Sequence, residues 1–343
     1  MAGLTQFTQD DIVLDTQRVV TSTWSNNTNN LQVAFTSSAQ AVFGSATSSG
    51  AHFIEIYNAD PASDTSAEVQ YALAYGHKAG SGSLDFTSDT GAIGNSVSRN
   101  IYSQYRQLVF GDSGDTFTFD GFTPDDIYVI NINRARYKHN LKPGTLDLRI
   151  SGSSTFETLF LTDDSVTSTG SAIITNAGRQ FNIVSGSLGV RLGSNTTQVT
   201  NSGSFGLFYP DSGFMVLNPA AIDHHVPTAV PDTTSNNDSK NHEKLHNAIK
   251  GAEHFIIDSE EKISSQYYFA RARNNQYNYT TNPSFVDNNG NVIVDTFIDN
   301  PTTFITTVGL YNNNGDLVAV AKLSQPVTKD FTKETLIRVK LDY

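Results

Sequence analysis

Alternation of apolar and polar residues, broken by Asn-Gly turns, constrains this chain more than any other feature. The segment TTVGLYNNNGDLVAVAKLSQP, residues 306–326, has the pattern of two alternating strands joined at Asn314-Gly315. Asn and Gly adopt at low cost the positive φ angles that a tight hairpin turn needs. A second turn of this kind is expected at Asn289-Gly290. The pattern predicts an antiparallel sheet in the last third of the chain.

The last run of the sequence, residues 335–343, also alternates. One face has the apolar residues Ile337, Val339, Leu341 and Tyr343. Because side chains two apart in a strand point to the same side, we expect this face to be buried. We expect the neighbouring strand to be DLVAVAKL, residues 316–323. Alternatively, another subunit covers this face, since the edge of a sheet can pair with a strand of another chain.

Composition excludes several classes of protein. Charged residues make up 16% of the chain, below the roughly 25% of typical soluble domains. The net charge is −12 with no large Lys/Arg cluster, so direct binding to nucleic acid is not expected. The absence of cysteine excludes disulfides and thiolate metal sites. We also expect no membrane-spanning segment, no secretory signal and no cofactor.

The distribution of strand, turn and helix patterns predicts a mainly β, multidomain chain with a few helices. An N-terminal β-rich domain is expected over residues 1–150, with one helix near 91–108, and a middle β region over 151–222. Both parts are expected to be β-sandwich-like. The polar, proline-containing segment 223–241 has the composition of a linker. A C-terminal domain over 242–343 would then consist of a helix followed by an antiparallel β-meander.

The motif HEKLH places His242 and His246 one helical turn apart, as in zinc hydrolases. The extended form of that motif would need Gly and His at Ile249 and Ala252. Glu253 is about 10 Å further along the helix axis than His246, too far to share an ion. We therefore expect a surface helix with two flanking histidines and no metal, and a protein that is not an enzyme. A zinc hydrolase remains the alternative.

Interleaved aromatic and arginine residues follow this helix, in the segment SQYYFARARNNQYNY. Such a run can stack on bases or sugars, but it is also typical of protein interfaces. The acidic charge of the chain favours an interface. Together with the last run, it gives these interface candidates: Tyr267, Phe269, Arg271, Arg273, Tyr277, Tyr279, Ile337, Val339, Leu341 and Tyr343.

Several longer phrases, in this order, resemble one family of proteins. They are IYSQYRQLVFGD, DDIYVININRARYKHNLKPGTLDLRI, GLFYPDSGFMVLNP, YYFARARNNQYNYTTNPSF and the 306–326 segment. The chain, from about Trp24 to Tyr343, is similar to virion structural proteins of large contractile-tailed phages of the cyanophage and marine myovirus type. The family-specific phrases thus extend over nearly the whole sequence.

This resemblance implies a structural component of a phage virion, in the tail, baseplate or neck region. It implies assembly in the host cytoplasm through contacts with other virion proteins. We expect a homo-oligomer in a symmetric assembly. The Asn-, Ser- and Thr-rich composition leaves a second alternative, a receptor- or glycan-binding tail component.

Overall fold

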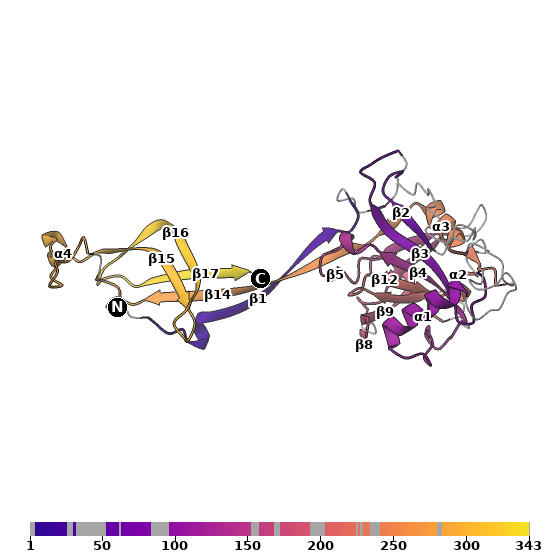
Figure 1. The fold of residues 1–343 in the computed structure, drawn as a ribbon, viewed down its shortest axis with the longest axis horizontal. Coiled ribbons are helices and arrows are strands. Elements are labelled where there is room, and N and C mark those ends of the chain that lie inside the picture. The colour runs from indigo at the N-terminus through magenta and orange to yellow at the C-terminus, as the bar shows by residue number, and fades with distance from the viewer. Residues whose placement is uncertain are drawn as a thin grey trace. The chain divides into compact units, whose positions relative to one another are not determined.

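The structure is a computed structural model that describes residues 4–25, 30–31, 53–61, 63–83, 96–151, 158–167, 172–192, 203–223, 226, 229–233, 241–279 and 283–342. The chain divides into two compact units. Unit 1 comprises Met1–Arg18 and Lys262–Tyr343, and unit 2 comprises Val19–Glu261. Two long strands, β1 (Ile12–Ser22) and β14 (Asp258–Ala272), contribute residues to both units (Figure 1).

Unit 2 is built on one large antiparallel sheet. Its long path runs β13-β6-β7-β9-β11-β12-β4-β3-β2, and two short strands, β8 and β10, pair with β9. The strands are β2 (Phe53–Tyr57), β3 (Val69–His77), β4 (Asp126–Ile132), β6 (Asp147–Ile150), β7 (Leu159–Asp163), β8 (Ile173–Thr175), β9 (Gly178–Ser187), β10 (Val190–Arg191), β11 (Gly206–Tyr209), β12 (Phe214–Leu217) and β13 (Phe255–Ile256). The helices are α1 (Val97–Phe110), α2 (Pro219–Asp223) and α3 (Asn241–Ala252), with short 3-10 turns beside them.

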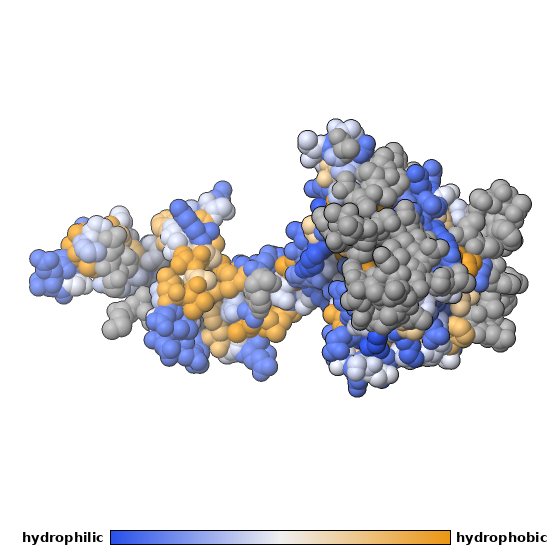
Figure 2. All heavy atoms as spheres, turned by 45° about the vertical axis from the view of Figure 1, so that its right-hand side comes forward, coloured by the Kyte–Doolittle hydropathy of each residue, from blue (hydrophilic) through white to orange (hydrophobic). Residues whose placement is uncertain are grey.

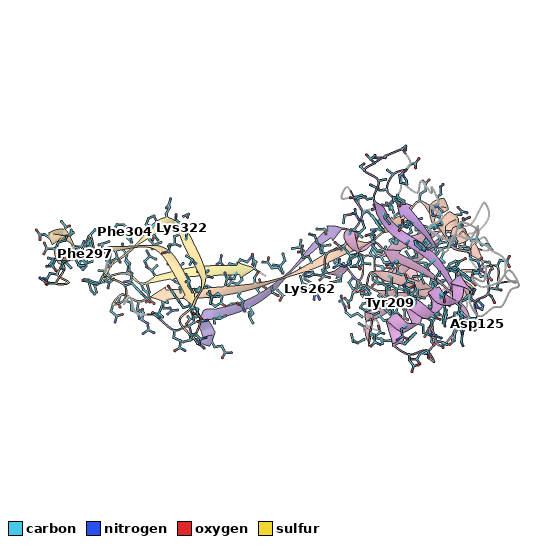
Figure 3. All side chains as sticks on the ribbon, in the orientation of Figure 1. Asp125, Tyr209, Lys262, Phe297, Phe304 and Lys322 are labelled. Atoms are coloured by element: carbon cyan, nitrogen blue, oxygen red, sulfur yellow. The ribbon has the colours of Figure 1, made fainter. Side chains whose placement is uncertain are left out.

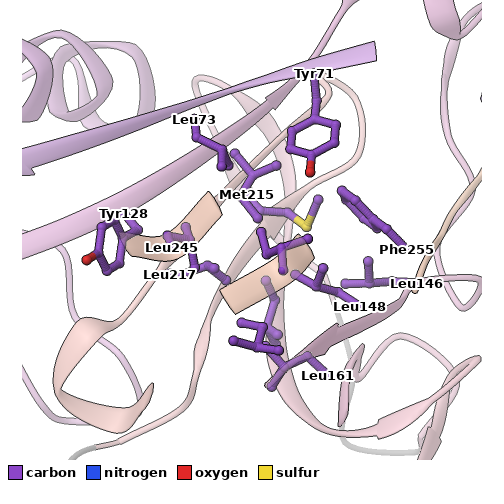
Figure 4. Close-up of a cluster of buried hydrophobic side chains, with 14 of the residues drawn as sticks. Tyr71, Leu73, Tyr128, Leu146, Leu148, Leu161, Met215, Leu217, Leu245 and Phe255 are labelled. Carbon is purple, nitrogen blue, oxygen red and sulfur yellow. The ribbon is translucent and has the colours of Figure 1, made fainter. Parts of the chain in front are cut away.

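The central strands of this sheet are buried on both faces. In β4, Tyr128 and Ile130 belong to the larger hydrophobic cluster, and Ile127 and Val129 to a second cluster on the opposite face. This explains why β4, β11 and β12 are nearly continuous apolar runs in the sequence. Figure 4 shows part of the larger cluster, where Met215 lies among residues of several strands.

Helix α3 closes the larger cluster. It contacts β6 near one end of the sheet and β3 and β2 at the other, so the sheet curls around the cluster. Leu245 and Ile249 of α3 are fully buried there.

Helix α1 packs on the opposite face, against β3. At Gly76 of β3 an added Cβ atom would lie 2.9 Å from the backbone nitrogen of Tyr102, so glycine permits this close approach. The helix ends at Gly111, whose φ of 71° is the left-handed conformation common at helix C-termini.

Unit 1 contains two small sheets. One has the strand order β1-β14-β17. The first residues of β14 belong to unit 2, and there Ser259 and Glu260 pair with the short strand β5 (Asn140–Leu141). The other is the two-stranded hairpin β15–β16. The further elements are η1 (Gln9–Asp11), α4 (Asp295–Asp299), β15 (Thr303–Tyr311), β16 (Leu317–Lys329) and β17 (Thr335–Asp342).

The buried ammonium of Lys329 connects the hairpin to the loop that follows β14. Its Nζ donates to the carbonyl oxygen of Asn274 at 3.1 Å, to Oδ1 of Asn278 at 2.8 Å and to the carbonyl oxygen of Asp330 at 2.9 Å. Thr303 adds a bond from its hydroxyl to the carbonyl oxygen of Tyr277 at 2.7 Å. These bonds fix the base of the hairpin inside unit 1.

The prediction of a mainly β chain with a few helices is confirmed. The ranges 1–150 and 151–222 do not form separate sheets, because β12 pairs with β4 and joins them in one. The helix expected near 91–108 is α1, although residues 91–95 lie outside the described part of the chain.

The C-terminal region also differs from the expected arrangement. Helix α3 belongs to unit 2, because its apolar side contacts that sheet. Within the predicted linker 223–241, mostly outside the described residues, Val226 and Ala229 are buried in the larger cluster of unit 2. The last strand, β17, pairs with β14 and not with residues 316–323, since the β15–β16 hairpin is a separate sheet.

Candidate interaction surfaces

The aromatic and arginine residues of β14 line one face of the β14–β17 pair. Tyr267, Phe269 and Arg271 are paired with Lys340, Arg338 and Leu336, so these side chains point to the same side. The guanidinium carbon of Arg338 lies 5.3 Å from the centre of the Tyr267 ring, and Nζ of Lys340 lies 5.9 Å from it. Two cations of this face therefore lie over the single ring of Tyr267.

The remaining residues of the aromatic run lie in the loop after β14. Arg273 directly follows the strand, and the hydroxyl of Tyr277 lies 2.7 Å from that of Thr5. The hydroxyl of Tyr279 donates to the carbonyl oxygen of Gly290 at 3.3 Å. Tyr277 and Tyr279 are both substantially exposed. The predicted run is thus divided between one strand face and a loop.

The apolar residues of β17 lie on the opposite face of the sheet. Ile337, Val339 and Leu341 pair with Ala270, Tyr268 and Gln266. Val339 is buried, and Ile337 and Leu341 are half-buried. This confirms the predicted alternation, while Tyr343 lies outside the described residues. The ten interface candidates therefore do not form one surface.

Charges on the face with the aromatic residues are paired locally. Nε of Arg271 lies 3.6 Å from Oε1 of Glu334, and Nζ of Lys340 lies 3.0 Å from Oδ1 of Asp342. A hydrogen bond from Ser265 and the neighbouring Lys340 hold the pKa of Asp342 below its usual value. Positive and negative charges are therefore mixed at these described positions of the face, without a large patch of like charge.

An exposed apolar surface that was not expected from the sequence lies on the β15–β16 hairpin of unit 1. Three antiparallel pairs form what we call the hairpin face: Thr307 with Lys322, Gly309 with Val320, and Tyr311 with Leu317. The exposed Phe304 pairs with Thr328 beyond a register shift, and Figure 3 labels Phe304 and Lys322 on these strands. The alternation predicted the two strands, but not which face of the hairpin stays exposed.

This exposed surface extends over other strands of unit 1. Figure 2 shows hydrophobic residues gathered over this unit, bordered by hydrophilic ones. The large apolar side chains of unit 1 that are exposed are Leu4, Ile12, Val13, Leu14, Tyr277, Tyr279, Ile293, Ile298, Phe304, Tyr311, Leu317, Val318, Val320, Phe331 and Leu336. Exposed apolar surface is frequent at sites of protein interaction.

The HEKLH histidines lie on the buried side of α3. His242 and His246 are each 3% exposed, in contrast to the surface helix expected from the sequence. Burial, with a smaller contribution from Lys250, lowers the pKa of His246 to about 4, so its imidazole is neutral at pH 7. Among the described residues no three His, Cys, Asp or Glu side chains are grouped to hold a metal ion. A catalytic zinc also needs an open coordination position.

One half-buried acid of unit 2 has a strongly perturbed pKa. Burial raises the pKa of Asp126 to about 6, and the nearby charges of Asp125 and Asp223 add to this effect. The hydroxyl of Tyr75 donates to Oδ2 of Asp126 at 3.3 Å and partly opposes the shift. At neutral pH this carboxyl is therefore close to its titration point.

Unit 2 also has a groove of about 560 Å³ beside α1. Its floor is formed by β2, β3 and β4, where Ala72 lies between Glu55 and Asn131 in one row across the three strands. One wall includes Tyr105 of α1, and the other includes Arg134, whose guanidinium carbon is 4.6 Å from the Tyr137 ring centre. The groove thus combines polar groups with aromatic rings.

Comparisons with protein-family models, curated proteins and solved structures give no match to this chain. Among the helices of the described residues, none is long and apolar enough to cross a bilayer.

Proposed function

We propose that this protein is a structural subunit of a phage particle, in the tail, baseplate or neck region, and that it acts through protein–protein contacts. The observation that supports assembly most strongly is the imbalance in unit 1. Its described buried apolar residues are Ala272, Phe297, Leu310 and Val339, whereas fifteen large apolar side chains are exposed. Figure 2 shows hydrophobic residues gathered over this unit, and a free monomeric protein rarely exposes large apolar patches.

The resemblance of the long sequence phrases to virion structural proteins supports the location in a particle. The partners are then other virion proteins, and assembly takes place in the host cytoplasm. The protein would have no catalytic role, in keeping with the buried positions of His242 and His246.

Electron microscopy of intact particles tests this function. Particles made from a genome that encodes the chain should bind gold-labelled antibodies against unit 2 at one defined position along the virion. Mass spectrometry of the same purified particles should recover its peptides in a fixed ratio to the capsid protein. If stringently purified particles contain no such peptides, the proposed function is wrong.

The groove of unit 2 favours a second candidate function, binding of a bacterial surface glycan. Pockets that hold small ligands combine apolar walls with a few oriented polar groups, as Glu55, Asn131 and Tyr105 do here. Titration with a panel of bacterial surface oligosaccharides, followed by NMR, tests this candidate. Ala72→Phe would fill the floor and abolish binding, whereas Gln107→Ala, an exposed position further along α1, should leave it unchanged.

A further inference from the structure

The side chains of Lys329 and Asn278 meet inside unit 1, at the base of the hairpin. Lys329 is fully buried, and Asn278 is 7% exposed. Nζ of Lys329 lies 2.8 Å from Oδ1 of Asn278. We propose that these side chains form an intramolecular isopeptide bond, which joins Nζ of Lys329 to Cγ of Asn278 and releases the amide nitrogen of the asparagine. Such a bond is a covalent modification of unit 1 and is independent of the role of the protein in a particle.

The carbonyl oxygen of Asn274 holds both nitrogen atoms that take part. It accepts from Nζ of Lys329 at 3.1 Å and from Nδ2 of Asn278 at 2.6 Å. Because the carbonyl bond of an amide is about 1.2 Å long, Nζ is at most about 4.0 Å from the carbon that it attacks. Reacting atoms about 3–3.5 Å apart are in a near-attack geometry. A small rotation of the Asn278 amide is therefore enough to reach it.

The backbone holds Asn278 in this position. The preceding residue, Tyr277, has a φ of 57°, a left-handed conformation that bulky residues rarely adopt. The hydroxyl of Thr303 in β15 donates to the carbonyl oxygen of Tyr277 at 2.7 Å. A strained backbone persists only where the surrounding structure fixes it, and such positions are frequent at functional sites. The loop is thus held against the hairpin before a covalent bond forms.

Lys329 has no counter-ion among the described residues. Its three hydrogen bonds go to neutral oxygens, the main-chain carbonyls of Asn274 and Asp330 and the amide of Asn278. The carboxylate of Asp330 pairs instead with Lys333. A buried charge without a partner of opposite charge is costly. The isopeptide bond is neutral, so its formation removes the charge from this buried position.

The reaction balances without a further reactant. Nζ of the ammonium gives up two protons and uses its lone pair to form the bond to Cγ. The bond between Cγ and Nδ2 breaks, its electron pair stays on Nδ2, and this nitrogen leaves as ammonium with the two protons. One ammonium and one primary amide thus become one secondary amide and one free ammonium ion. Among the described residues no carboxyl group is hydrogen-bonded to the pair, so we expect the bond to form slowly after folding.

A covalent link at this place suits the composition of unit 1. The chain has no cysteine, and the described buried apolar residues of the unit are few. Small cores of this kind usually need a covalent or metal link to be stable. The bond closes a ring of residues 278–329, which contains α4, β15 and β16. Such a ring restricts the unfolded chain in the way that a disulfide does.

Mass spectrometry of the full chain tests the bond. During a week at physiological temperature, most molecules of the purified protein should become lighter by the mass of one ammonia molecule. Trypsin should then fail to cleave after Lys329 and should release residues 274–322 joined to residues 323–333 as one branched peptide. Without the bond, the same digestion gives a separate peptide of residues 323–329.

Two arginine variants provide the matched comparison. Lys329→Arg keeps a cation but removes the nucleophilic amine, so the branched peptide should be absent. Lys333→Arg changes an exposed lysine close in sequence and keeps the tryptic site, so the branched peptide should form as in the unmodified protein. If Lys329→Arg does not fold, the peptides of the unmodified protein and of Lys333→Arg still decide.

The inference is overturned if the unmodified protein keeps its full mass and yields only the free 323–329 peptide. Loss of ammonia without the branched peptide also contradicts it, because cyclisation of an asparagine onto its own backbone gives the same loss. A branched peptide that persists in Lys329→Arg would place the bond at another lysine and would likewise contradict it. The presence of the protein in phage particles is unaffected by each of these results, so the proposed function is tested separately.

Discussion

Tyr311 and Leu317 face each other across the β15–β16 hairpin, and each is about half exposed, at 48% and 53%. An apolar pair at this position normally stabilises a sheet from within. Here it lies on the open side of unit 1. The stability of unit 1 is therefore expected to depend on contacts that cover this side.

The two faces of β17 should respond differently to substitution. Val339→Asp with Leu341→Asp places two charges on the face that contains the buried Val339, and this should remove several kcal/mol of stability. Arg338→Ser with Lys340→Ser changes the open face, where stacking on Tyr267 is worth about 1 kcal/mol at most. Soluble yield and incorporation into particles measure the difference. Normal assembly of the Asp variant would mean that this face is not buried.

The buried ammonium of Lys329 should stabilise the base of the hairpin. Lys329→Met removes a donor from three acceptors, of which the carbonyl oxygen of Asn274 keeps its bond from Nδ2 of Asn278 at 2.6 Å. Oδ1 of the buried Asn278 loses the Lys329 donor, and an unsatisfied buried group costs about 1–3 kcal/mol. Chymotrypsin should then cleave faster after Phe304 and Tyr311. Lys333→Met removes an exposed lysine and should change the rate little. Equal cleavage rates in the two variants would contradict this role of Lys329.

Asp126 should make unit 2 less stable as the pH rises. Because burial raises its pKa to about 6, the folded state keeps a proton that the unfolded state releases above its ordinary pKa of 3.8. Folded unit 2 binds more protons between these values, so stability is lost as the pH rises from about 4 to 6, by about 3 kcal/mol at most.

Asp126→Asn should remove this dependence. The variant is expected to be more resistant to urea than the unmodified protein at pH 7.5 and similar to it at pH 4. Trp24 is the single tryptophan and is buried in unit 2, so its fluorescence reports the transition. Parallel pH profiles for the two proteins would show that Asp126 ionises normally in the folded state.

The HEKLH motif should not bind a catalytic zinc. His242 and His246 are buried in α3 near the apolar cluster of unit 2, and both pack on the sheet side of the helix. Elemental analysis of the purified protein should find well below one zinc per chain. One zinc per chain, lost on His242→Ala with His246→Ala, would restore the hydrolase alternative.

The sequence was sufficient to predict local structure. The alternation of β17 and the hairpin at Asn314-Gly315 depend on neighbours close in the chain. The pairing of β12 with β4 could not be predicted, because it joins strands far apart in the sequence. For the same reason the apolar face of α3 was visible but its partner sheet was not.

The interaction surface was harder to predict than the strands. In β15 and β16 both faces contain apolar residues, so periodicity alone does not tell which one the chain covers itself. The aromatic run of β14 was expected to contribute to an interface, and strand alternation and the following loop divide it between the two faces of β14 and a loop. The zinc motif similarly matched in spacing while its side chains face inward.

Hydrogen exchange as a function of protein concentration tests the central claim most directly. Amides of β15 and β16 should be protected at high concentration and lose protection on dilution, because association supplies the layer that covers the hairpin face. Amides of the central strands β4 and β12 should stay protected throughout, since their core lies within unit 2. Protection of the hairpin that is unchanged at the lowest measurable concentration would show that unit 1 is stable alone, and would contradict the account.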